Sequence, residues 1–435
     1  MTPSLLRSER RGRVRLGALL LAAVAGAAAC DAGPRETRAP EERLSFLVLA
    51  SERPVWLRIA ESFRATRGVS VDLVEGPNAT DLRESQYTAA LLAGDDSFDL
   101  VYMDVTWASK FASAGWLVPL DDLLTDDDLE GLLPEAVAAG RYRGRLYRVP
   151  VRTDVGLLYY RRDLLEAAGL APPRTFSELL DAARALQSPP QTWGFLWQGS
   201  QYEGLVCVFL EVLHGFGGFW VDEKTSEVGL DQAPALAALE FLRRCRSEER
   251  ISPPGVTSLK EDESRRLFQD GRAVFLRNWA YVFRLAQAPD SPVAGKIGVQ
   301  LMVHAPGSTG GATLGGWGFG ISRFSRRPRL AAAFIRHAVS LEAQRLLCRD
   351  TGYAPARAAA YRDPELLAAN PLLSEIRRIH ESAVSRPAIP RYALASDILQ
   401  RHVSACLAGL ASADRALADA ARETRLLLGE RRTGE

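Results

Sequence analysis

Short apolar runs alternate with amphipathic stretches through the first quarter of the chain. Three of these runs have the length and composition of buried strands: residues 45–50, 69–74 and 99–103. Between the first two, Trp56, Ile59 and Phe63 recur at the spacing of one helical face, and the stretch 82–93 predicts a second helix that ends at Gly94. Strands that alternate with helices of this length predict parallel βαβ units, and therefore an α/β fold.

Polar residues follow each of the three predicted strands. Glu52 comes after the first, a loop that ends with Arg83 after the second, and Asp104 directly after the third. Ligands of parallel α/β sheets bind in the loops at the carboxyl ends of the strands. We therefore expect these side chains to face a binding site.

The pattern changes where two extended apolar segments flank Arg152 and Asp154. We interpret these segments as the first crossing between two lobes, because a chain of 435 residues is too long for one ordinary core. Strands and helices then alternate again, and Thr175 and Glu178 have the spacing of a capping box. From about residue 328 the pattern is almost entirely helical, which predicts a helical C-terminal region.

A glycine-rich strand, residues 311–321, carries one large indole, Trp317, between closely spaced glycines. Glycine weakens a strand and is tolerated where something else must lie against the backbone. Upstream, Trp279 and Tyr281 lie at the junction of a predicted strand and a helix. Flat rings beside bare backbone suit a flat ligand with polar edges, such as a sugar ring. A bulged core strand with a buried tryptophan is the alternative interpretation.

Composition and motifs narrow the possible functions. A hydrophobic content of 47% and a charged content of 25% are typical of a soluble globular protein. The formal charge of +1, with dispersed arginines, argues against nucleic-acid binding. The five histidines do not pair at metal-ligand spacing, and no nucleotide-binding loop or nucleophile elbow occurs. We therefore predict no metal, no cofactor and no catalytic residue.

The first thirty residues predict a targeting segment. Several arginines precede an uncharged apolar run, and small residues lead to Cys30. This arrangement resembles the signal peptide of a bacterial lipoprotein (1–30), in which the cysteine is lipidated. Ala27 stands where leucine is usual, so ordinary secretion after signal cleavage is the alternative. Residues 31–43 then form a polar tether, and no later run is apolar for long enough to span a membrane.

The other four cysteines allow two interpretations. Export would permit disulfides between Cys207 and Cys245 or between Cys348 and Cys406, whereas buried free thiols are the simpler alternative. Their spacings match no metal-binding pattern.

Many short segments, in one order from about residue 44 to 427, resemble a known family. Among them are Val74–Pro77, Ala114–Asp121, Thr153–Tyr160, Tyr202–Gly204, Arg277–Trp279, Thr313–Trp317 and Gly352–Pro355. Together with the lipoprotein-like start, they resemble the extracellular solute-binding proteins of ABC sugar importers (family 1), most closely the trehalose/maltose-binding type. The resemblance implies a two-lobed periplasmic-binding-protein fold with hinge crossings between the lobes. Lobe 1 would comprise residues 44–150 and about 304–355, and lobe 2 about 151–303 and 356–430.

The resemblance also implies the residues that contact the ligand, with aromatic stacking walls and charged groups from both lobes. The candidates are Glu52, Arg83, Asp104, Asp154, Tyr202, Trp279, Tyr281, Gly316, Trp317 and Arg386. Asp104 and Asp154 would bind sugar hydroxyls from opposite lobes. For Arg83 and Arg386 a salt bridge between elements is the alternative role, and for Glu52 a charge at a helix N-terminus.

One residue departs from the family pattern. Arg152 stands where such proteins tend to carry an aromatic residue. A cation that lines the cleft would favour a phosphorylated or acidic sugar, whereas pairing with a carboxylate would change nothing about the ligand's charge. Alanine at Trp317 or Asp104 is expected to weaken sugar binding at least tenfold while leaving the melting temperature nearly intact.

The implied function is high-affinity capture of a di- or oligosaccharide for an ABC importer. Its partners would be the sugar, permease subunits with a separate ATPase, and the membrane through a lipid anchor on the outer side of the cell envelope. We expect a monomer. The alternatives are a carbohydrate-sensing lipoprotein and a glycoside hydrolase that uses Asp104 and Asp154 as acid and base.

Overall fold

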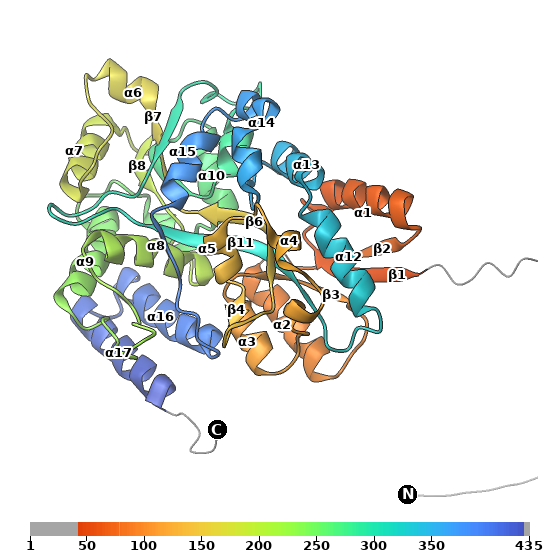
Figure 1. The fold of residues 1–435 in the computed structure, drawn as a ribbon. Coiled ribbons are helices and arrows are strands. Elements are labelled where there is room, and N and C mark those ends of the chain that lie inside the picture. The colour runs from red at the N-terminus through yellow and green to blue at the C-terminus, as the bar shows by residue number, and fades with distance from the viewer. Residues whose placement is uncertain (1–41, 78, 430–435) are drawn as a thin grey trace, which may run out of the picture. The chain divides into compact units, whose positions relative to one another are not determined.

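The computed structural model describes residues 42–77 and 79–429. The predicted signal peptide, with Cys30, and nearly all of the tether lie outside the described residues. Within them, strands alternate with helices and the α/β fold is confirmed (Figure 1).

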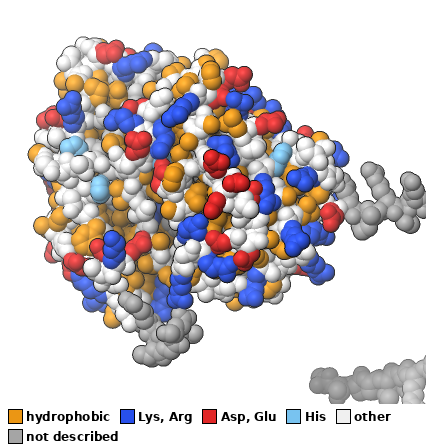
Figure 2. All heavy atoms as spheres, viewed as in Figure 1, with side chains coloured by type: hydrophobic (Ala, Val, Ile, Leu, Met, Phe, Trp, Pro, Cys, Tyr) orange, Lys and Arg blue, Asp and Glu red, His pale blue; other side chains and the backbone are white. Residues whose placement is uncertain are grey.

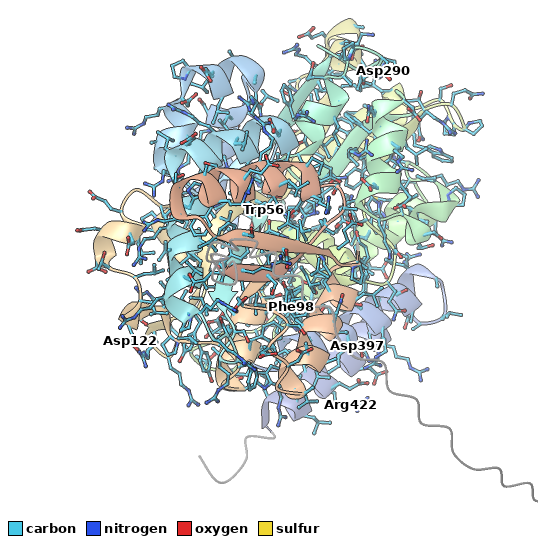
Figure 3. All side chains as sticks on the ribbon, turned by 90° about the vertical axis from the view of Figure 1, so that its right-hand side faces the viewer. Trp56, Phe98, Asp122, Asp290, Asp397 and Arg422 are labelled. Atoms are coloured by element: carbon cyan, nitrogen blue, oxygen red, sulfur yellow. The ribbon has the colours of Figure 1, made fainter. Side chains whose placement is uncertain are left out.

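The N-terminal elements follow the predicted order. They are β1 (Arg43–Val48), α1 (Arg53–Arg67), β2 (Ser70–Glu75), α2 (Thr80–Leu92), β3 (Leu100–Asp104) and α3 (Trp107–Ser113). Strands β1 and β2 pair in parallel, as a βαβ unit requires. Trp56 points from α1 onto the strands and lies fully buried against Phe46 (Figure 3). The apolar face of α1 therefore anchors the helix to this part of the core.

Two long strands lie at the centre of the molecule in Figure 1. Strands β6 (Val149–Val155) and β11 (Ala312–Ile321) pair antiparallel, and β3 pairs antiparallel with β11 on its other side. The expectation of purely parallel units did not include this pairing. The short strands β12 (Ala354–Pro355) and β13 (Ala383–Val384) complete the sheet.

Strand β11 is irregular at its middle. The register shifts between Trp317 and Gly318, and Gly316 has a φ of 126°. An added Cβ at Gly316 would lie 2.6 Å from the Arg152 carbonyl oxygen. Glycine is therefore required here both by backbone conformation and by the close approach of β6.

A second sheet has the strand order β10-β7-β9-β8. Its strands are β7 (Leu157–Arg161), β8 (Trp193–Leu196), β9 (Ala273–Asn278) and β10 (Ile297–Gln300). Around it lie α6 (Arg162–Ala167), α7 (Phe176–Leu186), α8 (Glu203–Gly215), α9 (Ala233–Ser247) and α10 (Glu261–Gln269). Only Gly156 separates β6 from β7, so the chain passes directly from the first sheet into the second. The predicted capping box of Thr175 and Glu178 is present at the start of α7.

The C-terminal region is helical, as predicted. Its helices are α12 (Pro328–Ala338), α13 (Leu341–Thr351), α14 (Pro364–Ala369), α15 (Leu373–His380), α16 (Tyr392–Leu407) and α17 (Ala413–Gly429). Residues of α16 and α17 share one hydrophobic core with α8 and α9, whereas α12 and α13 share another with α1 and β1. The remaining short elements are α4 (Asp126–Leu129), α5 (Pro134–Ala138), β4 (Arg141–Tyr142), β5 (Arg145–Leu146) and α11 (Val282–Ala286).

The structure shows whether four of the cysteines form disulfides. Cys207, Cys245, Cys348 and Cys406 are buried free thiols, so neither of the two possible disulfides forms. Burial raises the pKa of each of these thiols above its ordinary value.

The surface carries charges of both signs. Acidic and basic side chains are interspersed over the face in Figure 2, in keeping with the formal charge of +1. Among residues 42–77 and 79–429, no helix combines the length and the apolar character needed to cross a bilayer.

Candidate functional site

Charged and aromatic residues from three neighbouring strands lie on one face of the central sheet. Trp317 of β11 is opposite Asp104 of β3 on one side and Arg152 of β6 on the other. Two positions away on β11, Gly315 is opposite Asp154. Residues opposite each other, and two apart along a strand, share a face. The sheet register therefore brings four sequence-predicted positions into one cluster, which we call the central cluster.

The indole of Trp317 is packed rather than open. Its ring centroid lies 5.2 Å from that of Tyr102 and 5.2 Å from that of Trp107, and the side chain is only 7% exposed. The guanidinium of Arg83 lies 4.0 Å from the ring centroid. Trp317 is thus part of a bulged core strand and, at the same time, part of the central cluster.

Arg83 is a buried cation whose donors are not all used. The side chain is 3% exposed, and its Nε and Nη1 atoms have no hydrogen-bond partner among the residues that the structure describes. Burial lowers the pKa of Arg83, which the nearby Glu52 carboxylate counteracts. Among residues 42–77 and 79–429, these two atoms are therefore not engaged in the salt bridge that was the alternative role for Arg83.

The side chain of Arg152 contacts four neighbouring side chains and is 5% exposed. Its Nη2 donates to Glu52 Oε1 at 3.1 Å, and its Nη1 lies 3.5 Å from Asp154 Oδ2. Its Nε donates to the Tyr102 hydroxyl at 3.1 Å, and its guanidinium stacks 3.6 Å from the Tyr353 ring centroid. Of the two alternatives for this residue, the structure shows pairing with carboxylates.

Arg386 connects the C-terminal region to strand β3 of the central sheet and to helix α8. Its Nη2 donates to Asp104 Oδ1 at 2.9 Å, and its Nη1 donates to Glu203 Oε1 at 2.7 Å. Glu203 also accepts hydrogen bonds from the Tyr392 hydroxyl and from Ser396 Oγ. Arg386 therefore has the alternative role of an inter-element salt bridge, and through Asp104 it reaches the central cluster.

Trp279, which directly follows β9, lies next to the central cluster. Its indole approaches β11 so closely that an added Cβ at Gly315 would lie 3.2 Å from Trp279 Cζ3. The next backbone amide, that of Ala280, donates to Asp154 Oδ1 at 3.1 Å. Trp279 Nε1 lies 3.4 Å from Glu261 Oε1. The indole of Trp279 and the Cβ of Asp154 thus both lie beside Gly315.

The two predicted tyrosines lie at the edge of this arrangement. The ring centroid of Tyr281 is 5.9 Å from that of Tyr353, the ring on which Arg152 stacks. The Tyr202 hydroxyl is buried, and burial together with the Glu261 carboxylate raises its pKa. In the described part of the chain the ring contacts of Trp317 are with Tyr102 and Trp107, so Tyr202 and Tyr281 are peripheral to the central cluster.

Sequence reasoning missed four contact residues: Tyr102, Glu203, Arg277 and Tyr353. Each lies inside a segment that resembles the family: Asp99–Asp104 for Tyr102, Tyr202–Gly204 for Glu203, Arg277–Trp279 for Arg277 and Gly352–Pro355 for Tyr353. A polar or aromatic side chain within such a segment was the available signal.

A cavity of about 200 Å³ adjoins Glu203. Residues of α2, α3, α8 and α16 line it, including Asp81, Glu84 and Lys110. Burial, with help from Glu203 and Glu84, raises the pKa of Asp81 to about 6. Polar space therefore lies directly beside the link between Arg386 and Glu203.

Burial raises the pKa of Asp154 to about 6, although Arg152 and two backbone amides act in the opposite direction. The ordinary value of about 3.9 applies to the unfolded chain, so the folded state holds the proton more tightly. Between pH 4 and 6 this group therefore makes the protein less stable as the pH rises. We expect Asp154→Asn to flatten that part of the stability curve, measured by urea unfolding from pH 4 to 7. An unchanged slope would contradict the burial of a titrating carboxyl here.

Comparisons with known proteins identify the class. A family model described as bacterial extracellular solute-binding protein matches residues 50–345. The chain therefore belongs to this family, whose members act outside the cytoplasm. Solved structures with the same fold are two-lobed binding proteins, which confirms the expected architecture.

Individual relatives come from several organisms. A probable ABC transporter-binding protein of Deinococcus radiodurans is 32% identical over 335 residues, covering 76% of this chain and 79% of that protein. A mannitol-binding protein of Pseudomonas aeruginosa is 27% identical over 349 residues, covering 75% and 79%. The maltose-bound MalE3 of T. maritima has a TM-score of 0.84 and 36% identity, covering 88% of this chain and 99% of that chain. This chain is thus similar to binding proteins for sugars and polyols.

Proposed function

We propose that this protein is the high-affinity sugar-binding component of an ABC importer, and that it captures a di- or oligosaccharide of the maltose or trehalose type. The observation that carries the proposal is the state of the Arg83 side chain. Two of its donors are buried without a partner directly above Trp317. A buried donor without an acceptor is unfavourable, and the hydroxyl oxygens of a sugar would supply acceptors there.

Capture would proceed by closure of the two lobes that the family resemblance implies, residues 44–150 with about 304–355 and residues about 151–303 with 356–430. Asp104 and Glu52 would then belong to lobe 1, and Arg386 and Arg152 to lobe 2. Their ion pairs link these segments. A sugar that touches both lobes stabilises the closed state, and a Kd of roughly 1 μM corresponds to about 8 kcal/mol.

The partners of Arg152 remove the reason that this residue gave for expecting a charged ligand. Its charge is matched by Glu52 and Asp154, so the pairing leaves no cation free at this position. Three of the similar structures were solved with maltose, α-D-tagatose and ribitol, which are uncharged. A phosphorylated or acidic sugar remains the alternative that the experiment below includes.

Calorimetric titration of the purified protein with maltose, trehalose, mannitol and glucose 6-phosphate tests the proposal. We expect micromolar or tighter binding of a neutral sugar, and at least tenfold weaker binding by Arg83→Gln, since that variant removes charge-assisted donors. Arg58→Gln, on the exposed side of α1, is the matched control and should bind like the wild type. Failure of every sugar to bind would overturn the proposal, and binding of the phosphate alone would reverse the inference about Arg152.

Delivery would need partners. We propose that permease subunits with a separate ATPase accept the sugar from the closed, monomeric protein, and that a lipid on Cys30 holds the chain at the outer side of the membrane. A carbohydrate-sensing lipoprotein would share the same binding site. Under the hydrolase alternative, Asp104 and Asp154 would act as acid and base. We expect chromogenic glycosides to remain intact, and turnover abolished by Asp104→Asn would instead support that alternative.

A further inference from the structure

A fully buried ion pair lies where the chain passes between the two sheets. Arg277 of β9 is 0% exposed and Glu211 of α8 is 1% exposed. Arg277 Nε donates to Glu211 Oε2 at 2.8 Å, and Nη2 donates to Oε1. Arg277 Nη1 also donates to Gln198 Oε1 at 3.1 Å. A guanidinium that donates hydrogen bonds from both of its edges in this way is held in a single orientation.

The carboxylate of Glu211 also contacts both segments that connect the sheets. The Thr313 amide of β11 donates to Glu211 Oε1 at 3.1 Å, and the Gly156 amide donates to the Thr313 carbonyl at 3.2 Å. An added Cβ at Gly156 would lie 1.7 Å from Glu211 Oε1. The passage from β6 to β7 therefore runs directly against this carboxylate, and only glycine leaves room for it.

The guanidinium of Arg277 in turn supports Trp279. It lies 4.2 Å from the centroid of the Trp279 ring, at cation–π distance. Trp279 also approaches Gly315 of β11 and is neighboured by Asp154. The orientation of the indole thus depends on a cation whose own orientation is set at the two connecting segments.

We propose that Glu211 and Arg277 are positioning residues that couple the connections between the sheets to the ligand-binding wall formed by Trp279. This rests on the proposed function, because it assigns a role to the support of the same site. Movement of β11 or of the passage through Gly156 would shift Glu211, and Arg277 would transmit the shift to the indole. Sugar affinity would then depend on the ion pair without any contact between the pair and the sugar.

A double-mutant cycle tests the coupling. Arg277→Met and Glu211→Met are introduced together, because removing both charges leaves no unpaired ion in the core. The pair is replaced in the wild-type background and in Trp279→Ala, and the affinity for maltose is measured by calorimetry. We expect the pair replacement to weaken binding about tenfold in the wild type and less than about twofold in Trp279→Ala. The two effects should not add, because the pair is proposed to act on binding through Trp279.

A second readout does not need a ligand. With 5-fluorotryptophan incorporated, the ¹⁹F resonance of Trp279 is assigned with Trp279→Phe, and the pair replacement should shift it while leaving that of Trp56 in place. Urea unfolding checks that the variant folds. The exposed pair Asp96 and Arg326 supplies the control replacement, which should change neither affinity nor spectrum.

The outcomes distinguish failure of the positioning role from failure of the proposed sugar-binding function. Equal loss of affinity in both backgrounds, or an unshifted Trp279 resonance, would overturn the positioning role while leaving sugar binding in place. Absence of any sugar binding by the wild type would overturn the proposed function, and the fluorine spectrum would still decide whether the pair orients Trp279.

Discussion

Replacing Trp317 by alanine is expected to weaken sugar binding at least tenfold and to destabilise the fold by about 3–5 kcal/mol. The indole packs against Tyr102 and Trp107 and carries the Arg83 guanidinium on its ring. Its removal would leave a cavity in the core and take away the surface that positions Arg83. Calorimetric titration and urea unfolding of the same preparation measure the two effects.

The structure corrects the sequence-based expectation that this variant would keep its melting temperature. That expectation assumed an indole exposed in a cleft, whereas the side chain is almost fully buried. Trp317→Phe is the matched control, because it keeps an aromatic ring and should lose less stability than alanine. Full stability of Trp317→Ala would contradict the packing described here.

Replacing Asp104 by alanine is expected to weaken sugar binding at least tenfold as well, a loss of about 1.4 kcal/mol or more. The carboxylate accepts hydrogen bonds from Arg386, from the Thr106 amide and from the Thr106 hydroxyl. Without it, Arg386 would keep only Glu203 as an anionic partner, and the link between the C-terminal region and β3 would be lost. Affinity is measured by titration with the best-binding sugar of the panel.

Asp104→Asn separates charge from shape in this prediction. The amide can still accept from Thr106, so a smaller loss of affinity than with alanine would show that local geometry contributes. Unchanged affinity in both Asp104 variants would remove this residue from the site. A comparable loss in the exposed control Asp181→Asn would show that the effect is not specific to Asp104.

Local patterns in the sequence were sufficient for the elements but not for their pairing. The helical spacing of Trp56, Ile59 and Phe63 predicted α1, and Thr175 with Glu178 predicted the start of α7. The antiparallel pairing of β3 with β11 joins residues about two hundred positions apart. Nothing in either strand's own pattern specifies that partner, so the mixed character of the central sheet could not be predicted.

The features of the candidate site also divide into those that the sequence could predict and those that it could not. The positions of Asp104 and Asp154 beside the glycine-rich strand follow from strand ends and from the family resemblance. The partners of Arg152 do not, because Glu52 lies one hundred residues away and Tyr353 about two hundred. The choice between a cation facing the ligand and a cation paired with acids depends on such distant contacts.

The four buried thiols bear on how this protein can be made and handled. Since no disulfide joins residues of the described chain, its folding requires packing alone and no oxidising catalyst. Thiols of raised pKa stay protonated at neutral pH and react slowly with alkylating or oxidising agents. Reductant in the buffer should therefore not affect these four thiols in the native protein, and their labelling by a maleimide would report the opening of the core.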